Sequence, residues 1–215
     1  MNPLCKLCGT GTTRFIHRKL GHFHHCSHCE FIFKDEAHIL DEQSEFESYQ
    51  RHNNSIDDPR YVDFFYRFLE DAVFPYTGKG KQGFDFGSGP SPVLAQILER
   101  HHGYEMDIFD IFYSPEKVYE GKKYDLITCT EVVEHLRDPI HHFRLFTELM
   151  TPGSILSVMT LFHDNNEDNF LNWHYMRDRT HISFYTPATM EYIADQVGLE
   201  VIHTNDVRYI TFRLK

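Results

Sequence analysis

Four cysteines near the N-terminus have the spacing of a metal site. Cys5 and Cys8 form one C-x-x-C pair, and Cys26 and Cys29 form a second pair after a gap of 17 residues. Each pair can place two thiolates on one tetrahedral ion, so the two pairs together complete the coordination of Zn²⁺. Four protein ligands leave no open position, which predicts a structural zinc. Two disulfides or a redox pair are the alternatives, and a reducing compartment disfavours both.

The segment that carries these cysteines, residues 1–34, is predicted to be a small zinc ribbon with short strands over residues 12–16 and 23–25. Four nearby histidines could each replace a cysteine: His22, His24, His25 and His28. Because four thiolates already suffice, these rings are expected to be solvated. The fifth cysteine, Cys129, lies in an apolar run and is expected to pack in the core.

A glycine-rich turn follows a short apolar run that contains Asp85. Gly87, Ser88 and Gly89 form this turn, and a helix is expected next, with Ser91 as its cap and a proline at its first position. Glycines there let the backbone approach a ligand that any Cβ would push away. A nucleotide-type cofactor is therefore predicted, the alternative being an ordinary turn between strand and helix.

Two features refine this cofactor site. Asp110 ends the next apolar run, residues 104–109, about 20 residues after the glycines, where an acid can accept hydrogen bonds from ribose hydroxyls. Pro92 stands where the dinucleotide fingerprint has its third glycine, which disfavours an NAD-dependent oxidoreductase.

A third group of reactive residues directly follows a predicted buried strand, residues 124–130. Glu131, Glu134 and His135 have i, i+3, i+4 spacing, so in a helical turn they would share one face. Two carboxylates and an imidazole can hold a divalent ion, with His181 as a fourth ligand, and such an ion would lower the pKa of a bound hydroxyl. The alternative is that Glu131 borders the cofactor, Glu134 is solvated and His135 acts as a base or caps a helix.

Residues 160–185 are predicted to form a long irregular insert after the strand at 155–159. It should therefore lie at the carboxyl edge of the sheet, where open α/β folds bind ligands. Its candidate substrate-binding residues are Trp173, Tyr175, Arg177, Asp178, Arg179 and His181. The alternative is that Trp173 and Phe184 only anchor the loop to the core.

The elements that must position these residues alternate between strand and helix. Helix starts with a capping residue before proline occur at Asp138 and Thr186, a further helix begins at Asp58, and a closing hairpin is expected to turn at Asn205–Asp206. This alternation predicts a mostly parallel sheet in an α/β fold. Only 13 residues separate Asp110 from Tyr124, so the usual crossover helix there is expected to be truncated.

This order of elements over residues 83–213 resembles the class I S-adenosylmethionine (SAM) dependent methyltransferases. It is most similar to the subgroup with EVxEHL after the fourth strand, which includes the polyprenyl-hydroxybenzene O-methyltransferases, and the WxYxxDxTHxSFY segment resembles them too. Ser91 replaces the last glycine of the family's DxGxGxG pattern. The resemblance implies a Rossmann-like sheet with an antiparallel last strand. It implies cofactor-binding roles for Asp85, Gly87, Ser88, Gly89, Asp110, Thr130 and Glu131.

The same resemblance implies methyl transfer to a small hydroxylated acceptor, for which His135, His181 and Glu134 are the candidate catalytic residues. Some relatives with an ExxEH segment use it for Mg²⁺-assisted O-methylation, so Mg²⁺ is a candidate cofactor beside SAM and zinc. Similar cysteine-knuckle segments precede some methyltransferase domains. The expected organisation is a zinc ribbon at 1–34, a linker and lid helices at 35–80, and the methyltransferase domain at 81–215.

Composition limits the partners. A formal net charge of −11 argues against a broad nucleic-acid surface, and there is neither a long apolar run nor an N-terminal signal. A cytoplasmic protein that acts on a small molecule is expected, and no oligomeric state is predicted. The remaining alternative is a non-catalytic module whose ribbon binds RNA or protein. Its support in the sequence is a group of basic residues in the ribbon: Arg14, His17, Arg18 and Lys19.

Overall fold

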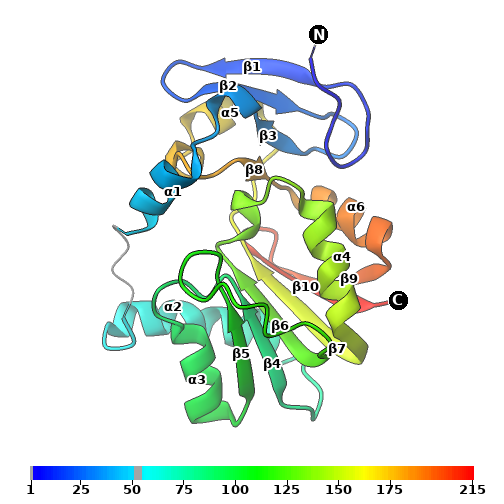
Figure 1. Cartoon of the computed structure of the whole chain (residues 1–215). Helices are drawn as coiled ribbons and strands as arrows, with labels where there is room; N and C mark the ends of the chain where they lie inside the picture. The colour runs from blue at the N-terminus through cyan, green and yellow to red at the C-terminus, as the bar shows by residue number, and fades with distance from the viewer. Residues whose placement is uncertain (1, 51–54) are drawn as a thin grey trace.

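Parallel strands followed by helices build the larger part of the molecule (Figure 1). A computed structural model describes residues 2–50 and 55–215. Within them the central sheet has the order β5-β4-β6-β7-β10-β9. The bounds are β4 (Gln82–Phe86), β5 (Glu105–Phe109), β6 (Tyr124–Thr130), β7 (Met150–Met159), β9 (Leu199–Thr204) and β10 (Tyr209–Leu214). Strands β4 to β7 are parallel and β10 is antiparallel to both neighbours, which confirms the predicted sheet.

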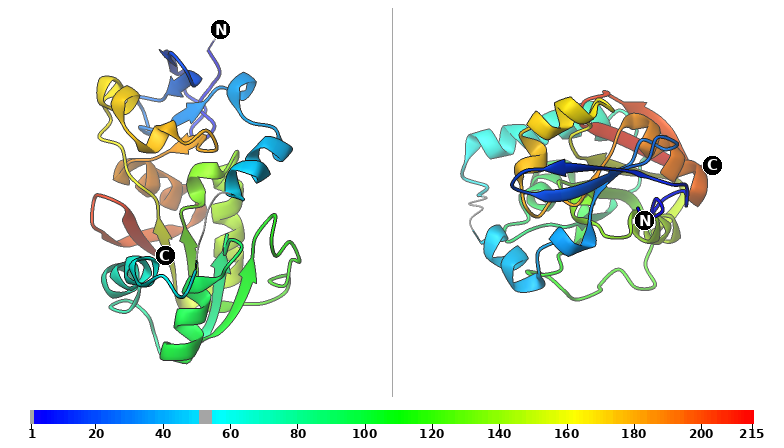
Figure 2. Two further views of the ribbon diagram at one scale, coloured as in Figure 1. Left: turned by 90° about the vertical axis from the view of Figure 1, so that its left-hand side faces the viewer. Right: turned by 90° about the horizontal axis from the view of Figure 1, so that it is seen from above.

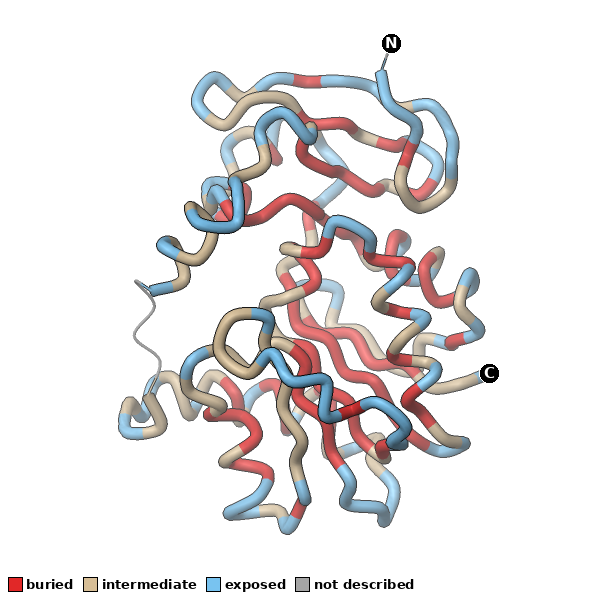
Figure 3. Tube along the Cα trace, viewed as in Figure 1, coloured by how far each residue is buried: buried red, intermediate tan, exposed pale blue. Residues whose placement is uncertain are grey.

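Helices cover both faces of this sheet. One face packs against α4 (Pro139–Leu149) and α6 (Pro187–Val197), and the other against α2 (Pro59–Phe68) and α3 (Val93–His102). The central strands between them are buried (Figure 3). Since side chains alternate along a strand, Ile127 and Cys129 of β6 join the first cluster while Leu126 joins the second. No helix of the described residues is long and apolar enough to cross a membrane.

Most of the predicted helix starts are confirmed. Asp58, Asp138 and Thr186 each accept a hydrogen bond from a backbone N–H in the first turn of their helix. The predicted start at Ser91 is wrong by one residue. Pro92 is itself the N-cap of α3, because its ψ of 64° is not helical and its carbonyl accepts the first intrahelical bond.

The expected truncation between β5 and β6 is confirmed. Turns and an isolated bridge between Asp110 and Ser114 occupy this stretch, and the described residues contain no helix there. The outer edge of β5 also lacks a pairing strand among the described residues, so β5 forms one edge of the sheet.

A second, smaller sheet lies above the first and contains the N-terminal ribbon (Figures 1 and 2). Its strands are β1 (Thr13–His17), β2 (Gly21–His25), β3 (Ile32–Lys34) and β8 (Ser183–Phe184). The two strands predicted for the ribbon are present as β1 and β2, which pair antiparallel, and β3 additionally pairs with β8 from the insert. The ribbon also contacts α6, since Thr189 Oγ1 donates to the Cys29 carbonyl at 2.8 Å.

Short elements fill the two segments predicted to be linker and insert. The insert contains α5 (Glu167–Asn172), η4 (Tyr175–Arg177) and β8, so it is less irregular than expected. The linker contains η1 (Glu36–His38) and α1 (Glu42–Tyr49), and its residues 51–54 lie outside the described residues. A π-helical turn, η2 (Leu69–Val73), continues α2, and η3 (Val133–His135) follows β6.

The glycine turn after β4 yields a matched pair of substitutions. Gly87 has a φ of +85°, and a Cβ on it would lie 2.1 Å from Val132 Cγ2; Gly89 has a φ of +66° and open space around it. We expect Gly89→Ala to lower the free energy of unfolding by about 1–2 kcal/mol through backbone strain alone. Gly87→Ala should cost a further ~1–3 kcal/mol, because Val132 must move. Urea denaturation of both variants measures the difference, and equal losses would contradict the close packing of Gly87 on Val132.

Candidate active site

The turn after β4 is held against the end of β5. The backbone N–H groups of Gly87 and Ser88 both donate to the Phe109 carbonyl, at 2.7 and 3.1 Å. Gly89 N–H donates to Asp110 Oδ2 at 2.9 Å. These bonds bring the glycines and Asp110 together at the carboxyl ends of two parallel strands, as the sequence predicts.

The two aspartates at this edge also have structural partners. Asp110 Oδ1 accepts from the N–H groups of Phe112 and Tyr113, so this carboxylate shapes the turn after β5. Asp85 is only 2% exposed and accepts from Thr128 Oγ1 at 2.7 Å, and burial raises its pKa to about 6. Asp110 Oδ2 and both oxygens of Asp85 keep a lone pair that these bonds do not use, so both residues can still accept a bond from a ligand.

Two polar atoms beside this turn have no hydrogen-bond partner among the described residues. They are Ser88 Oγ and Glu131 Oε1, and both atoms are buried. Glu131 also has a φ of +54°, which is unusual for a residue other than glycine. Buried polar atoms without partners and a strained backbone both mark places where a ligand completes the structure. Thr130, which is half-buried at the end of β6, directly precedes Glu131 in the chain.

Glu134 is completely buried and lies at the centre of a second group. Its Oε1 accepts a short hydrogen bond from the Tyr175 hydroxyl, and its Oε2 accepts from Thr160 Oγ1 at 2.9 Å. Burial, followed by the charge of Glu131, raises the pKa of Glu134 well above its usual range. The prediction that Glu134 is solvated in the metal-free alternative is therefore wrong.

Two histidines complete this group. The rings of His135 and His181 meet edge to face with centroids 4.9 Å apart. His135 Nδ1 bonds the Thr180 carbonyl at 3.1 Å, and His181 Nδ1 bonds the Tyr175 carbonyl at 2.8 Å. A carbonyl only accepts, so both neutral rings carry their proton on Nδ1 and present Nε2 as the acceptor. Potential ligand atoms of Glu134, His135 and His181 all lie within 4.8 Å of one another.

Glu131 does not share a helical face with this group, contrary to the expectation from spacing. Its left-handed backbone ends β6, and the helical turn η3 begins only at Val133. Glu131 reaches the group indirectly, because the Tyr175 hydroxyl is also 3.1 Å from its Oε2.

The insert places its predicted residues in different surroundings. Tyr175 and His181 are buried beside Glu134. Trp173 packs against Phe170 and Phe184, and Arg177 is exposed and donates to the Asn172 carbonyl.

Asp178 and Arg179 directly precede Thr180, whose carbonyl bonds His135. Asp178 Oδ1 accepts from Thr180, and Arg179 is exposed. Thr160 was not among the predicted site residues, because its only signal in the sequence is its position directly after β7. Tyr49, an aromatic residue of the segment predicted to contain lid helices, also borders the group, since its ring lies 5.4 Å from that of His135.

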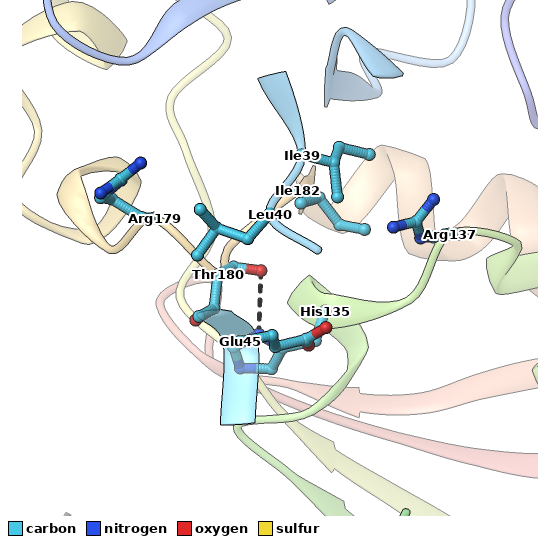
Figure 4. A pocket seen from close by; sticks show the side chains of 8 residues that line it. All are labelled: Ile39, Leu40, Glu45, His135, Arg137, Arg179, Thr180 and Ile182. Carbon is cyan, nitrogen blue, oxygen red and sulfur yellow. Dashed lines mark hydrogen bonds between the residues drawn. The ribbon is translucent and has the colours of Figure 1, made fainter. Parts of the chain in front are cut away.

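A narrow cavity of about 20 Å³ opens beside His135. Figure 4 shows it between Thr180, Glu45 and the side chains of Ile39 and Leu40. This volume holds about one water molecule.

The four N-terminal cysteines lie close together, as predicted. Their sulfur atoms are all within 4.8 Å of one another, with 3.5 Å between Cys5 and Cys29 and 3.4 Å between Cys8 and Cys26. These residue types and this clustering fit a four-thiolate zinc site.

The structure contradicts the expected exposure of His24 and confirms the expected burial of Cys129. His24 is buried rather than solvated, because its Nε2 pairs with Asp35 Oδ2 at 2.7 Å. Cys129 is fully buried, as expected for core packing.

Comparison with known proteins gives a consistent family. A family model described as a methyltransferase domain matches residues 55–204. A ubiquinone biosynthesis O-methyltransferase of Dinoroseobacter shibae is 28% identical over 130 residues, covering 56% of this chain and 51% of that protein. One of Aeromonas salmonicida is 26% identical over 137 residues, covering 59% and 56%. The chain thus spans about half the length of the curated relatives it matches.

Solved structures share the fold. The mitomycin 7-O-methyltransferase MmcR aligns with a TM-score of 0.52 at 14% identity, covering 80% of this chain and 67% of that one. An O-methyltransferase from neocarzinostatin biosynthesis, solved with S-adenosyl-L-homocysteine and 1,4-dihydroxy-2-naphthoic acid, aligns at 0.51 and 13% identity, covering 74% and 59%. At such identities the likeness concerns the fold alone. Because the family model covers most of the chain, this protein belongs to the methyltransferase-domain family and has the fold of the class I SAM-dependent enzymes.

Proposed function

We propose that this chain transfers a methyl group from SAM to a hydroxyl of a small acceptor. The observation that carries the proposal is the buried, unpartnered Oε1 of Glu131 on a strained backbone beside the glycine turn. A fold used only as a scaffold has no need to retain such an atom. This favours an enzyme over a non-catalytic module, and Pro92 in place of a third glycine disfavours an NAD-dependent one.

The residues around the turn suit the parts of the cofactor. Gly87 and Gly89 would lie against the methionine carboxylate. A Cβ on Gly89 would meet no described atom within 4 Å, so this space is left for the cofactor, whereas at Gly87 the same space is taken by Val132. Asp110 would accept from the ribose hydroxyls, and Thr130 with Glu131 would form the floor of the pocket. When bound, SAM supplies an electrophilic methyl group on a sulfonium centre, so the protein contributes mainly alignment.

His135 is proposed as the general base on the acceptor side. Its Nε2 would take the hydroxyl proton as the oxygen attacks the methyl carbon, while the Thr180 carbonyl holds the ring orientation through Nδ1. A second candidate is a Mg²⁺ ion held by Glu134, His135 and His181, which the closeness of their ligand atoms favours. Trp173 and Arg177 would contribute to the wall of the acceptor pocket.

Zinc bound by the four cysteines is proposed to have a structural role. Cys5, Cys26 and Cys29 are buried and belong to the same apolar cluster as α4 and α6. An ion there would anchor the ribbon on the methyltransferase domain.

Cofactor binding tests the proposal directly. We expect the zinc-loaded protein to bind S-adenosylhomocysteine in a calorimetric titration. Asp110→Asn should weaken binding by about 1.5–3 kcal/mol, because it removes charged hydrogen bonds. Asp107→Asn is the matched control, since Asp107 lies on β5 shortly before Asp110 but pairs with Lys122 and Tyr124. Absence of binding by the folded wild-type protein would refute the proposal.

Metal content tests the zinc site. Protein purified under reducing conditions should contain one zinc per chain, and Cys8→Ser should release it more readily to a chelator. Lowering the pH should also release the metal, because the thiolates bind it in competition with protons. Atomic absorption and a colorimetric zinc indicator measure both effects. Zinc content unchanged in a Cys5→Ser, Cys26→Ser double variant would place the metal elsewhere.

Turnover separates the two acceptor-side mechanisms once tritium transfer from labelled SAM has identified an acceptor. We expect His135→Ala to lower kcat by about 10²–10⁴-fold while S-adenosylhomocysteine affinity is retained. His141→Ala, on an exposed position of α4, is the control. Turnover should not change when divalent ions are withdrawn from protein that keeps its zinc. Loss of turnover on withdrawal, restored by Mg²⁺ in the wild type but not in Glu134→Gln, would instead support the metal mechanism.

A further inference from the structure

A second and larger cavity lies outside the active site, where the ribbon meets the insert. Its volume is about 540 Å³. The turn between β1 and β2, the segment from β3 to the start of α1, and the insert all contribute to its wall. This size lies within the range of small-molecule sites.

The charge of this cavity is opposite to that of the chain. Four cations line it: Arg18, Lys19, Lys34 and Arg179. Among the described residues that line it, Asp41 is the only one with a carboxylate, and its Oδ1 already accepts from the Ser44 N–H at the start of α1. In a protein with a formal net charge of −11, such a concentration of positive charge needs a local reason.

Lys34 is the buried member of this group. Its side chain is 2% exposed, and its Nζ donates one hydrogen bond, to the Arg179 carbonyl at 2.8 Å. Burial, followed by the charge of Arg179, lowers its pKa to about 8, while Asp178 acts weakly in the opposite direction. Lys34 is therefore still protonated at neutral pH, with two further N–H donors, and a buried ammonium is costly unless an anion pairs with it.

The other cations of the cavity are exposed and have no ion pair within the described parts of the chain. Lys6 and Lys122, by contrast, each pair with a carboxylate at 2.6 Å. Arg177 strengthens the local field, since its charge and that of Lys19 add to burial in lowering the pKa of His17. These side chains are thus available to a ligand from outside the chain.

We propose that this cavity binds a phosphoryl group. A dianion matches several cations converging on one space, and the guanidinium groups of Arg18 and Arg179 can each donate two parallel hydrogen bonds to phosphoryl oxygens. A concave site between three segments suits a small molecule better than an extended nucleic-acid strand.

The position of this cavity connects it to methyl transfer. Ile39, Leu40 and Arg179 line both it and the narrow cavity beside His135. In Figure 4 the side chain of Arg179 points away from His135, and Leu40 lies between them. The phosphoryl group could therefore belong to the methyl acceptor, whose other end would approach His135 once Leu40 moves aside. This part rests on the proposed function; a free phosphate ion is the other source.

Calorimetric titration of the full-length, zinc-loaded protein tests the site. The probes are inorganic phosphate, pyrophosphate, phenyl phosphate and glucose 1-phosphate, with S-adenosylhomocysteine titrated into the same preparations. We expect at least one phosphoryl probe to bind, and the Arg18→Gln, Arg179→Gln double variant to weaken it about tenfold or more. Lys34→Met, which removes the charge but keeps the volume, should weaken it similarly.

Arg14→Gln is the matched control. Arg14 is an exposed arginine of the same ribbon that does not line the cavity, so its loss should change affinity less than about twofold. Tighter binding of an ester than of either inorganic ion supports a phosphorylated acceptor. Equal binding supports the phosphoryl site but assigns it to a free ion.

Two results would overturn the proposal. One is that no phosphoryl probe binds to a preparation that does bind S-adenosylhomocysteine or a single-stranded RNA oligomer. The other is that Arg14→Gln weakens binding as much as the double variant, which would mean only a diffuse charge effect. If the phosphoryl probes bind and S-adenosylhomocysteine does not, the result would count against the proposed function but would still support the phosphoryl site.

Discussion

The buried side chain of Glu134 is the interaction on which the arrangement of the site depends. A carboxyl group removed from water must have its hydrogen bonds supplied by the protein. Tyr175 and Thr160 supply them from the insert and from the end of β7, and the backbone carbonyl of Glu134 accepts from Ile182 N–H at 2.8 Å. One residue thus connects the end of the sheet to both halves of the insert.

The position of the ribbon follows from this connection. Because Ile182 is held on Glu134, the next residues form β8 and pair with β3, and Phe184 packs against Phe23. The cysteine-containing ribbon is therefore attached to the methyltransferase fold through the same insert that carries His181. This attachment also brings Arg179 over Lys34, so the cationic cavity arises from the contact between two segments that are remote in the sequence.

Local patterns in the sequence predicted most helices and strands, but they could not predict contacts between residues that are far apart in the chain. The cap at Asp138, the clustering of the four cysteines and the short connection after Asp110 follow from patterns among neighbouring residues, and all three are present as predicted. The pairing of β3 with β8 involves a two-residue strand about 150 positions away, which has no periodicity to detect. The spacing of Glu131 and Glu134 suggested a helical face, but a left-handed residue at the strand end separates them. No local pattern in the sequence predicts the left-handed conformation of Glu131.

The environment of Glu134 also bears on the two acceptor-side mechanisms. Its raised pKa means that burial and the nearby Glu131 carboxylate favour the protonated acid. A metal ion needs the carboxylate, so binding Mg²⁺ there must first overcome this preference and then compete with Tyr175 and Thr160 for the same oxygens. A neutral imidazole at His135 needs neither step, since its Nδ1 proton is already committed to the Thr180 carbonyl. In this arrangement Glu134 holds the insert, and His135 is the group that we propose for proton transfer.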